Sequence, residues 1–94
     1  MNIDGFIWLE DIVEKLWHKH RVDEKEVEEV FDNSPFFRFV ESGHVEGENV
    51  YAAFGQSNGG RYLIIFFVYK QNKQILIVSA RDMTNSERKQ YERR

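Results

Sequence analysis

The stretch from Arg61 to Tyr69, RYLIIFFVY, constrains the fold of this chain more than any other. After the arginine it is nearly all apolar, so it shows neither the alternation of a half-buried strand nor the spacing of an amphipathic helix. It is also far too short to span a membrane as a helix. A short, β-prone apolar run of this kind is typical of a central strand that is covered on both faces.

Neighbouring segments supply the partners that such a strand needs. Asn58 and Gly59 form the strongest short hairpin signal, and if these two residues are the whole loop, Gln56 pairs with Arg61. The sequence KQNK at 70–73 turns the apolar strand into the next one. The other predicted strands are Phe36–Val40, Val50–Gln56 and Gln74–Ala80.

Helix signals occupy the two ends of the chain. Asp23 and Glu26 have the spacing of a capping box, as do Thr84 and Glu87 near the C-terminus. The sequence DNSP at 32–35 ends the helix that follows Asp23, because a proline biases the preceding residue away from helical geometry. An earlier helix is predicted from a single apolar stripe: Trp8, Ile12, Val13, Leu16 and Trp17.

These elements predict an α+β fold in the order α-α-β-β-β-β-α. Its core is a four-stranded antiparallel sheet packed by helices. The length of 94 residues suits one domain covering 1–94. The chain has no cysteine, which excludes disulfides and thiolate metal sites, and its N-terminus shows no signal-peptide pattern.

Charge is distributed unevenly along the chain. Residues 1–50 hold 5 Lys/Arg and 13 Asp/Glu, a net −8, whereas residues 51–94 hold 8 Lys/Arg and 3 Asp/Glu, a net +5. This asymmetry is expected if one face binds an anion and the acidic half docks a basic partner. It has no such meaning if the two halves interleave in space.

Two arginines mark a candidate anion site. Arg61 begins the apolar strand and Arg81 ends the last one, so successive hairpins bring them to the same end of the sheet. An odd-length KQNK loop places them on one face, where two guanidinium groups suit a phosphate. A two-residue loop places them on opposite faces. Arg88 and Tyr91 share a face of the last helix. The alternative is that Arg61 and Arg81 are ordinary strand-end charges, which contribute little to stability.

The histidines give weaker signals. His18 and His20 flank Lys19 at a predicted helix C-terminus, where cations are favourable without any function. His44 lies near two glutamates in the loop ESGHVEGE, but a solvated loop is the better interpretation than a metal site. No metal or cofactor site is therefore predicted.

Three stretches of the sequence resemble the BrnT family of type II toxins. They are VEKLWHKHRV with EVEEVF, then GHVEGENVYAAFGQSNGGRYLIIFFVY, and then ILIVSARDMTNSERKQYE. The series GR, SAR, ER and Y, in register, carries the resemblance. It implies a compact RelE-like fold and a cytoplasmic, metal-independent ribonuclease that blocks translation, in some cases at the ribosome. It also implies a ribbon-helix-helix-like antitoxin, through which the pair would bind promoter DNA.

The resemblance also assigns site residues. Arg61, Arg81 and Tyr91 are the implied catalytic residues, with His20 as the acid–base candidate, and Lys19 and Arg88 would bind RNA. The chain departs from the family at Arg21, where a glycine is usual, and on its first helix. These departures motivate an alternative, a catalytically inactive module that retains partner or RNA binding. A plain structural interaction domain is the third possibility.

Overall fold

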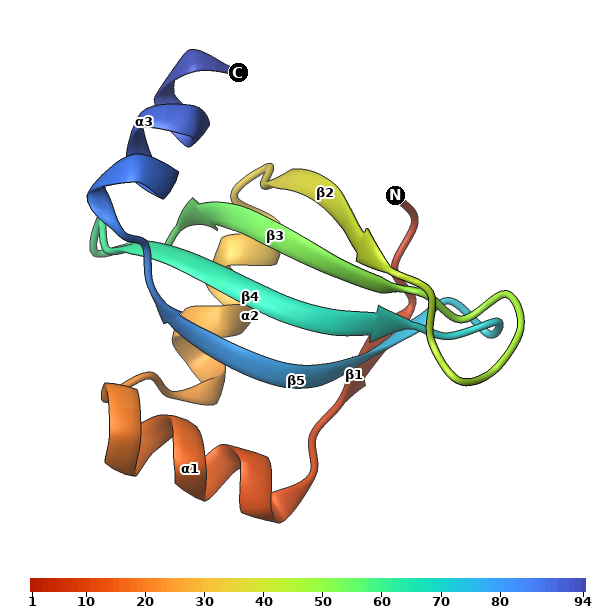
Figure 1. Cartoon of the computed structure of the whole chain (residues 1–94). Coiled ribbons are helices and arrows are strands. Elements are labelled where there is room, and N and C mark those ends of the chain that lie inside the picture. Colours follow the sequence, from red (N-terminus) through yellow and green to blue (C-terminus); the bar gives the residue numbers. More distant parts are fainter.

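One twisted sheet separates the helices of this protein into two groups (Figure 1). The computed structural model describes all residues 1–94. Helices α1 and α2 lie against one face of the sheet, here called the helical face, and α3 lies over one end of the other, here called the α3 face. The elements are β1 (Gly5–Ile7), α1 (Glu10–His20), α2 (Glu24–Asp32), β2 (Phe36–Glu41), β3 (Val50–Gln56), β4 (Tyr62–Tyr69), β5 (Gln74–Asp82) and α3 (Asn85–Arg93).

The sheet has five strands in the order β1-β5-β4-β3-β2, not the four that the sequence predicts. β2 to β5 are antiparallel as expected, but β1 adds to the edge in parallel with β5. β1 pairs Gly5 with Gln74 and Ile7 with Leu76. Three residues are too few to show a strand period, so β1 is recognisable only through its pairing with β5.

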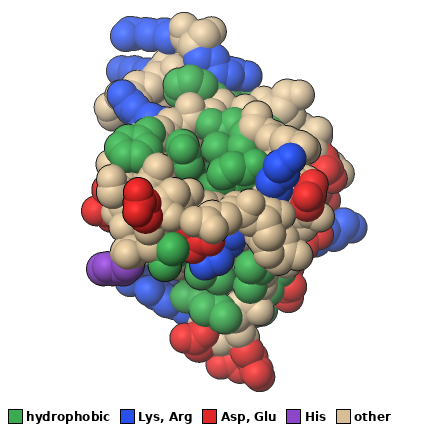
Figure 2. All heavy atoms as spheres, turned by 90° about the vertical axis from the view of Figure 1, so that its right-hand side faces the viewer, with side chains coloured by type: hydrophobic (Ala, Val, Ile, Leu, Met, Phe, Trp, Pro, Cys, Tyr) green, Lys and Arg blue, Asp and Glu red, His purple; other side chains and the backbone are tan.

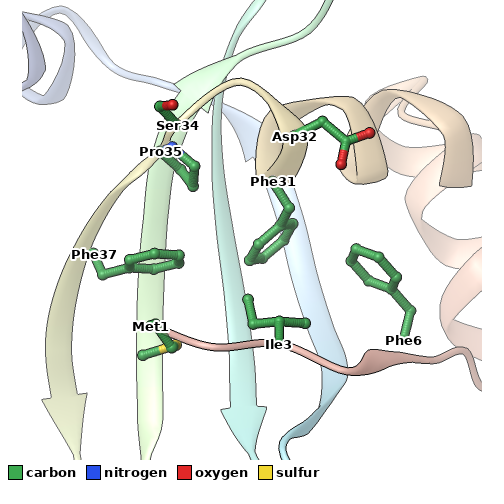
Figure 3. Close-up of a pocket in the computed structure, with 8 residues that line it drawn as sticks. All are labelled: Met1, Ile3, Phe6, Phe31, Asp32, Ser34, Pro35 and Phe37. Carbon is green, nitrogen blue, oxygen red and sulfur yellow. The ribbon is translucent and has the colours of Figure 1, made fainter.

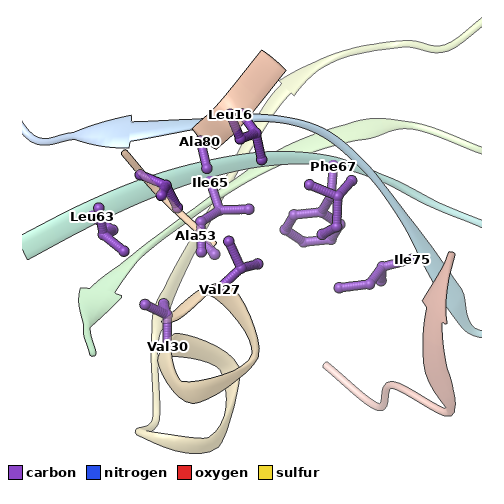
Figure 4. Packing of buried hydrophobic residues seen from close by; sticks show 11 residues of the cluster. Leu16, Val27, Val30, Ala53, Leu63, Ile65, Phe67, Ile75 and Ala80 are labelled. Atoms are coloured by element: carbon purple, nitrogen blue, oxygen red, sulfur yellow. The ribbon is translucent and has the colours of Figure 1, made fainter. Parts of the chain in front are cut away.

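β4 occupies the centre of the sheet, as its continuous apolar sequence predicts. Leu63, Ile65 and Phe67 point to the helical face and are fully buried. Ile64, between them, points to the α3 face and is only 2% exposed. Figure 4 shows the larger cluster, in which side chains of β4 meet Leu16 from α1 and Val27 and Val30 from α2.

The predicted capping boxes are both confirmed. Asp23 accepts from the backbone N–H of Glu26, and Thr84 accepts from that of Glu87, with each glutamate bonding back to its cap. Val22 and Val27 are fully buried beside the first of these caps, as a hydrophobic staple requires. The apolar stripe predicted for α1 is wrong in two respects, because Trp8 lies before the helix, which begins at Glu10, and Trp17 remains 46% exposed.

The β3–β4 hairpin differs from the prediction by one residue. Gln56 pairs with Tyr62, not with Arg61. Ser57 and Arg61 form the last hydrogen-bonded pair, so the loop has three residues, of which the last, Gly60, has a φ of 88°. This left-handed conformation suits glycine and is typical of a three-residue hairpin loop. A slip of one residue reverses the face of every side chain relative to the partner strand, so it decides where Arg61 points.

The β4–β5 hairpin contains an irregularity that the sequence does not reveal. Its loop also has three residues, Gln71 to Lys73, between the pair that Lys70 and Gln74 form. A register shift follows farther along, because Phe66 pairs with Ser79 while Phe67 pairs with Ile77. Val78 is therefore an extra residue, a β-bulge, which reverses the side-chain alternation of β5 beyond it.

None of the three helices has the length and hydrophobicity needed to cross a bilayer.

Candidate functional site

Arg61 is surrounded by hydrogen-bond acceptors at the end of the sheet. Its Nε donates to Asp82 Oδ1 at 2.7 Å and its Nη2 to Asp82 Oδ2 at 3.1 Å. Nη2 also donates to the carbonyl of His20 at 2.8 Å, and Nη1 donates to the carbonyl of Arg21 at 2.7 Å. Nη1 reaches Glu26 Oε1 at 3.2 Å as well. Since a guanidinium has five N–H donors, all of them have protein partners here.

These contacts make Arg61 a clamp between three parts of the fold. The carbonyls of His20 and Arg21 belong to the end of α1, where a helix leaves acceptors unpaired. Glu26 belongs to the first turn of α2, and Asp82 ends β5. The hydrogen bond from Arg61 lowers the pKa of Asp82, and the bond to Asp82 raises the pKa of Arg61. Both groups are therefore ionised at neutral pH.

Arg81 lies on the opposite face. Its Nη1 and Nη2 donate to the two oxygens of Glu87 at 2.7 and 3.0 Å, and its guanidinium lies 5.7 Å from the ring centroid of Phe66. Nη1 also donates to the carbonyl of Asp82 at 3.2 Å. These three bonds leave Nε–H and one Nη2–H, which together form one edge of the guanidinium, without a protein acceptor. Arg81 thus keeps a bidentate edge for an anion, whereas Arg61 keeps none.

The α3 face next to Arg81 combines arginines with aromatic rings. Arg88 lies over the ring of Tyr62 at 3.9 Å from its centroid and forms a 3.6 Å ion pair with Glu92. Tyr91 packs edge-on against Tyr62 at 5.9 Å and is only 6% exposed. Its ring is thus part of the smaller core, and it also lines a polar pocket formed mainly by Asn33 and residues of the β3–β4 loop.

Lys19 and His20 fall on the other side of the sheet, in the last turn of α1. Lys19 is exposed and His20 is half-buried. Its backbone carbonyl accepts a hydrogen bond from Arg61, which places His20 beside the Arg61 clamp. His20 and Arg81 are therefore not brought together on one face.

The six predicted site residues form two groups at the same end of the sheet. Lys19, His20 and Arg61 lie on the helical face, and Arg81, Arg88 and Tyr91 lie on the α3 face. An odd-length loop predicts that Arg61 and Arg81 lie on one face, and this prediction is wrong. The loop is odd, but the bulge at Val78 reverses the alternation before Arg81 is reached.

Arg38, Arg93 and Arg94 also lie on or beside the α3 face, and the sequence did not single them out. Arg38 pairs across the sheet with Ala52, whose side chain packs under α3, and its Nη1 donates to Gln90 of α3 at 3.0 Å. In the space-filling view, Lys and Arg side chains gather at the top, where α3 lies, and acidic side chains at the bottom, where α1 lies (Figure 2). Strand alternation in β2 could have placed Arg38 there once the sheet order was known.

Other hollows lie away from these residues. A pocket beneath the start of the chain is lined mainly by aromatic and aliphatic side chains, including Ile3, Phe6, Phe31 and Phe37 (Figure 3). It holds none of the predicted site residues. In the loop that precedes β3, Glu48 accepts from Lys70 Nζ at 2.8 Å and from the backbone N–H of Gln71, and these bonds lower its pKa.

Comparison with known families agrees with this architecture. A family profile described as "Ribonuclease toxin, BrnT, of type II toxin-antitoxin system" matches residues 8–87. The chain belongs to the BrnT family. A crystal structure of the Brucella abortus ribonuclease toxin BrnT superposes with a TM-score of 0.60 and 18% sequence identity, over 86% of this chain and 97% of that one. At this identity the likeness shows a shared fold. A search of curated protein sequences gives no significant match.

Two conclusions follow from membership of the BrnT family. The family consists of ribonuclease toxins of type II toxin–antitoxin systems, and a toxin of this type implies an antitoxin partner. The matched residues include Lys19, His20, Arg61 and Arg81, but Arg93 and Arg94 lie beyond them.

Arg61→Ala is expected to destabilise the fold, contrary to the expectation that a strand-end arginine contributes little. Its removal leaves Asp82 and two helix-end carbonyls without donors, and leaves Glu26 with only the backbone N–H of its cap, Asp23. We therefore expect the free energy of unfolding to fall by about 2 kcal/mol. Arg81→Ala breaks one partly exposed pair and is expected to cost about 1 kcal/mol or less. Urea unfolding of both variants measures the difference, and equal destabilisation of the two would contradict the clamp.

Proposed function

We propose that this protein is an endoribonuclease toxin whose RNA lies on the α3 face, with Arg81 on the scissile phosphate. The observation that carries the proposal is the free edge of Arg81, held in place by the bidentate contact of its other edge with Glu87. An arginine that is both oriented and still able to donate two parallel hydrogen bonds suits a phosphate. The membership of a ribonuclease family supplies the substrate class.

The proposed chemistry needs no metal. The RNA 2′-hydroxyl attacks the adjacent phosphorus and gives up its proton to water, while the bond to the 5′-oxygen breaks. Water protonates the departing 5′-oxygen, so the products are a 2′,3′-cyclic phosphate and a 5′-hydroxyl. Negative charge grows on the non-bridging oxygens during attack, and fixed donors stabilise it. Nε and Nη2 of Arg81 are the proposed donors. Arg88, whose exposed side chain lies over Tyr62, is the proposed contact for a neighbouring phosphate.

The remaining predicted residues take supporting roles in this proposal. Tyr91 is proposed to orient Arg88 and the RNA through its packing against Tyr62. Arg61 is proposed as a positioning residue, because it holds Asp82, the residue directly after Arg81. Lys19 is proposed to contact RNA that continues around the end of the sheet. His20, the predicted acid–base residue, lies on the helical face and takes no part in proton transfer at Arg81 in this proposal. Glu87 is a poor base, since the hydrogen bond from Arg81 lowers its pKa.

The cellular consequences that we propose follow from the same chemistry. Cleavage of messenger RNA in the cytoplasm would inhibit translation. The antitoxin is proposed to be a ribbon-helix-helix-like protein that also binds promoter DNA. For its docking surface we propose the exposed side of α1, where Leu9 and Trp17 are 47% and 46% exposed. Leu9 precedes the acidic first turn, and the guanidinium of Arg21 lies 5.3 Å from the ring centroid of Trp17. Exposed aromatic anchors surrounded by charge are typical of interface hot spots.

The docking surface can be tested with the antitoxin. Trp17→Ala is expected to weaken toxin–antitoxin binding by roughly tenfold or more, because a buried aromatic anchor commonly carries about 2 kcal/mol. Val40→Ala, which changes an exposed apolar residue on β2 at the other edge of the sheet, is the control. Isothermal titration calorimetry gives the affinities. Crosslinks from the antitoxin that fall only within residues 51–94 would contradict this placement.

The competing function is a catalytically inactive binding module. If catalysis requires Arg61 to bind the phosphate, this alternative is favoured, because all N–H donors of Arg61 already have protein acceptors. Induced expression with and without the antitoxin separates the two functions. An active toxin arrests growth and degrades RNA, and co-expression of the antitoxin restores both. Binding to RNA without growth arrest or cleavage would support the inactive module.

Arg81→Ala is expected to reduce RNA cleavage about a hundredfold. This corresponds to a decrease of about 3 kcal/mol in transition-state stabilisation. Arg81→Lys is expected to recover little, since lysine cannot form the bidentate contact. Cleavage of a labelled single-stranded RNA by purified protein measures the rates, with Lys15→Gln, a substitution of an exposed residue on α1, as the matched control. His20→Ala is measured in parallel. Full activity of a folded Arg81→Ala variant would reject the proposed role of Arg81.

A further inference from the structure

A shallow groove between the last turn of α3 and the start of β2 concentrates positive charge. It is lined by Phe36, Arg38, Gln90, Arg93 and Arg94 and has a volume of about 280 Å³. That volume is close to the lower end of the range for small-molecule sites, roughly 300–1,000 Å³. Three of the five lining side chains are arginines and none is a carboxylate.

The arginines of this groove differ in their partners from three other arginines of the chain. Arg61, Arg81 and Arg88 each form an ion pair with Asp or Glu. Arg38 has only the neutral amide of Gln90, and Arg94 donates to the carbonyl of Tyr91 at 2.6 Å while it lies over the ring of Tyr91. Arg93 forms no ion pair. The groove therefore holds uncompensated charge that an anion can neutralise.

Phe36 adds an aromatic surface to this charge. Its ring is 36% exposed and is supported from within by Phe54 at 5.8 Å between centroids. A phenylalanine held by a second ring and open to solvent, next to arginines, is the combination with which proteins bind single-stranded nucleic acid. The arginines follow the phosphates and the ring stacks on a base.

The groove lies on the same face of the sheet as Arg81. Phe36 pairs with Phe54 and Arg38 with Ala52, and both partners pack in the smaller core with Tyr91 and Ile64. Ile64 in turn pairs with Arg81. A strand of RNA with one phosphate at Arg81 can continue along α3 towards Phe36, through Arg94 and its contact with Tyr91.

We propose that this groove is a second RNA subsite, which binds a phosphate with Arg38 and Arg93 and stacks a base on Phe36. The proposal rests on the ribonuclease function proposed above and extends it to residues outside the catalytic group. The combination of residues in the groove favours RNA over an acidic protein segment. An acidic segment would bind the arginines but would leave the exposed ring of Phe36 without a stacking partner.

The test separates charge from stacking. Binding of a fluorescent 2′-O-methyl RNA of about 12 nucleotides, which cannot be cleaved through its 2′-hydroxyls, is measured by anisotropy at several salt concentrations. The double variant Arg38→Gln with Arg93→Gln is expected to flatten the plot of log affinity against log salt by about 0.7 for each phosphate that the variant no longer neutralises. Phe36→Ala is expected to weaken binding roughly tenfold without changing that slope.

Controls keep the outcomes distinct. Lys15→Gln removes one exposed charge on the other side of the sheet and is expected to leave the slope unchanged. Phe36→Tyr keeps an aromatic ring and is expected to bind like the wild type, which guards against a folding defect in Phe36→Ala. Unchanged affinity and slope in the double arginine variant would overturn the subsite. The same result combined with weaker binding of a polyglutamate peptide would instead identify a protein-docking site.

Cleavage is measured on the same proteins with unmodified RNA. If the wild-type protein binds RNA through the groove but does not cleave it, the ribonuclease proposal fails and the subsite stands. If it cleaves RNA and the groove variants bind as tightly as the wild type, the subsite fails and the ribonuclease proposal stands.

Discussion

One extra residue in β5 determines which face each of the two strand-end arginines occupies. Without the bulge at Val78, the three-residue β4–β5 loop would align Arg61 and Arg81 on one side of the sheet. With it, Asp82 turns to the helical face and Arg81 turns to the α3 face. A β-bulge changes the direction of side chains in this way wherever it occurs, and such bulges are common near functional sites. The division of labour between the two arginines follows from it.

Arg61 is therefore a structural residue, whereas Arg81 can still bind an anion. On the helical face, Arg61 links the end of α1, the first turn of α2 and the end of β5 through five hydrogen-bond donors. On the α3 face, Arg81 is anchored by one carboxylate and keeps one edge free. The acidic helix α2, with five Asp/Glu and one Lys, lies on the helical face, and the arginine-bearing α3 lies on the other, so part of the charge asymmetry along the sequence becomes a separation in space (Figure 1). Under the proposed function, a basic partner on the helical side and RNA on the α3 face would therefore not compete for the same charges.

Local rules predicted the elements whose signals lie within a few residues of each other. The two capping boxes, the end of α2 at DNSP and the central position of β4 depend on short spacings or on one continuous apolar run, and all are confirmed. β1 escaped prediction because three residues carry no period, and the hairpin register failed because Gly60, not only Asn58 and Gly59, belongs to the loop.

The site was harder to predict because its geometry depends on residues far apart in the chain. The partners of Arg61 include Arg21 and Glu26, at separations of 40 and 35 residues, and no spacing rule connects them. The bulge at Val78 has no glycine or other local signal. Arg38 and Arg93 come together only because β2 lies under the end of α3, which requires the complete sheet order. The catalytic roles of Arg61, Arg81, Tyr91 and His20 stay predictions.

The most direct measurement follows the Nε–H signals of the two arginines by NMR in protein labelled with ¹⁵N-arginine. The account predicts that titration with uncleavable 2′-O-methyl RNA shifts the Nε–H resonance of Arg81, whose free edge then donates to a phosphate. The resonance of Arg61, already bonded to Asp82, is predicted to stay where it is in the free protein. A shift of Arg61 with no change at Arg81 would contradict the account, because it would place the phosphate on the helical face.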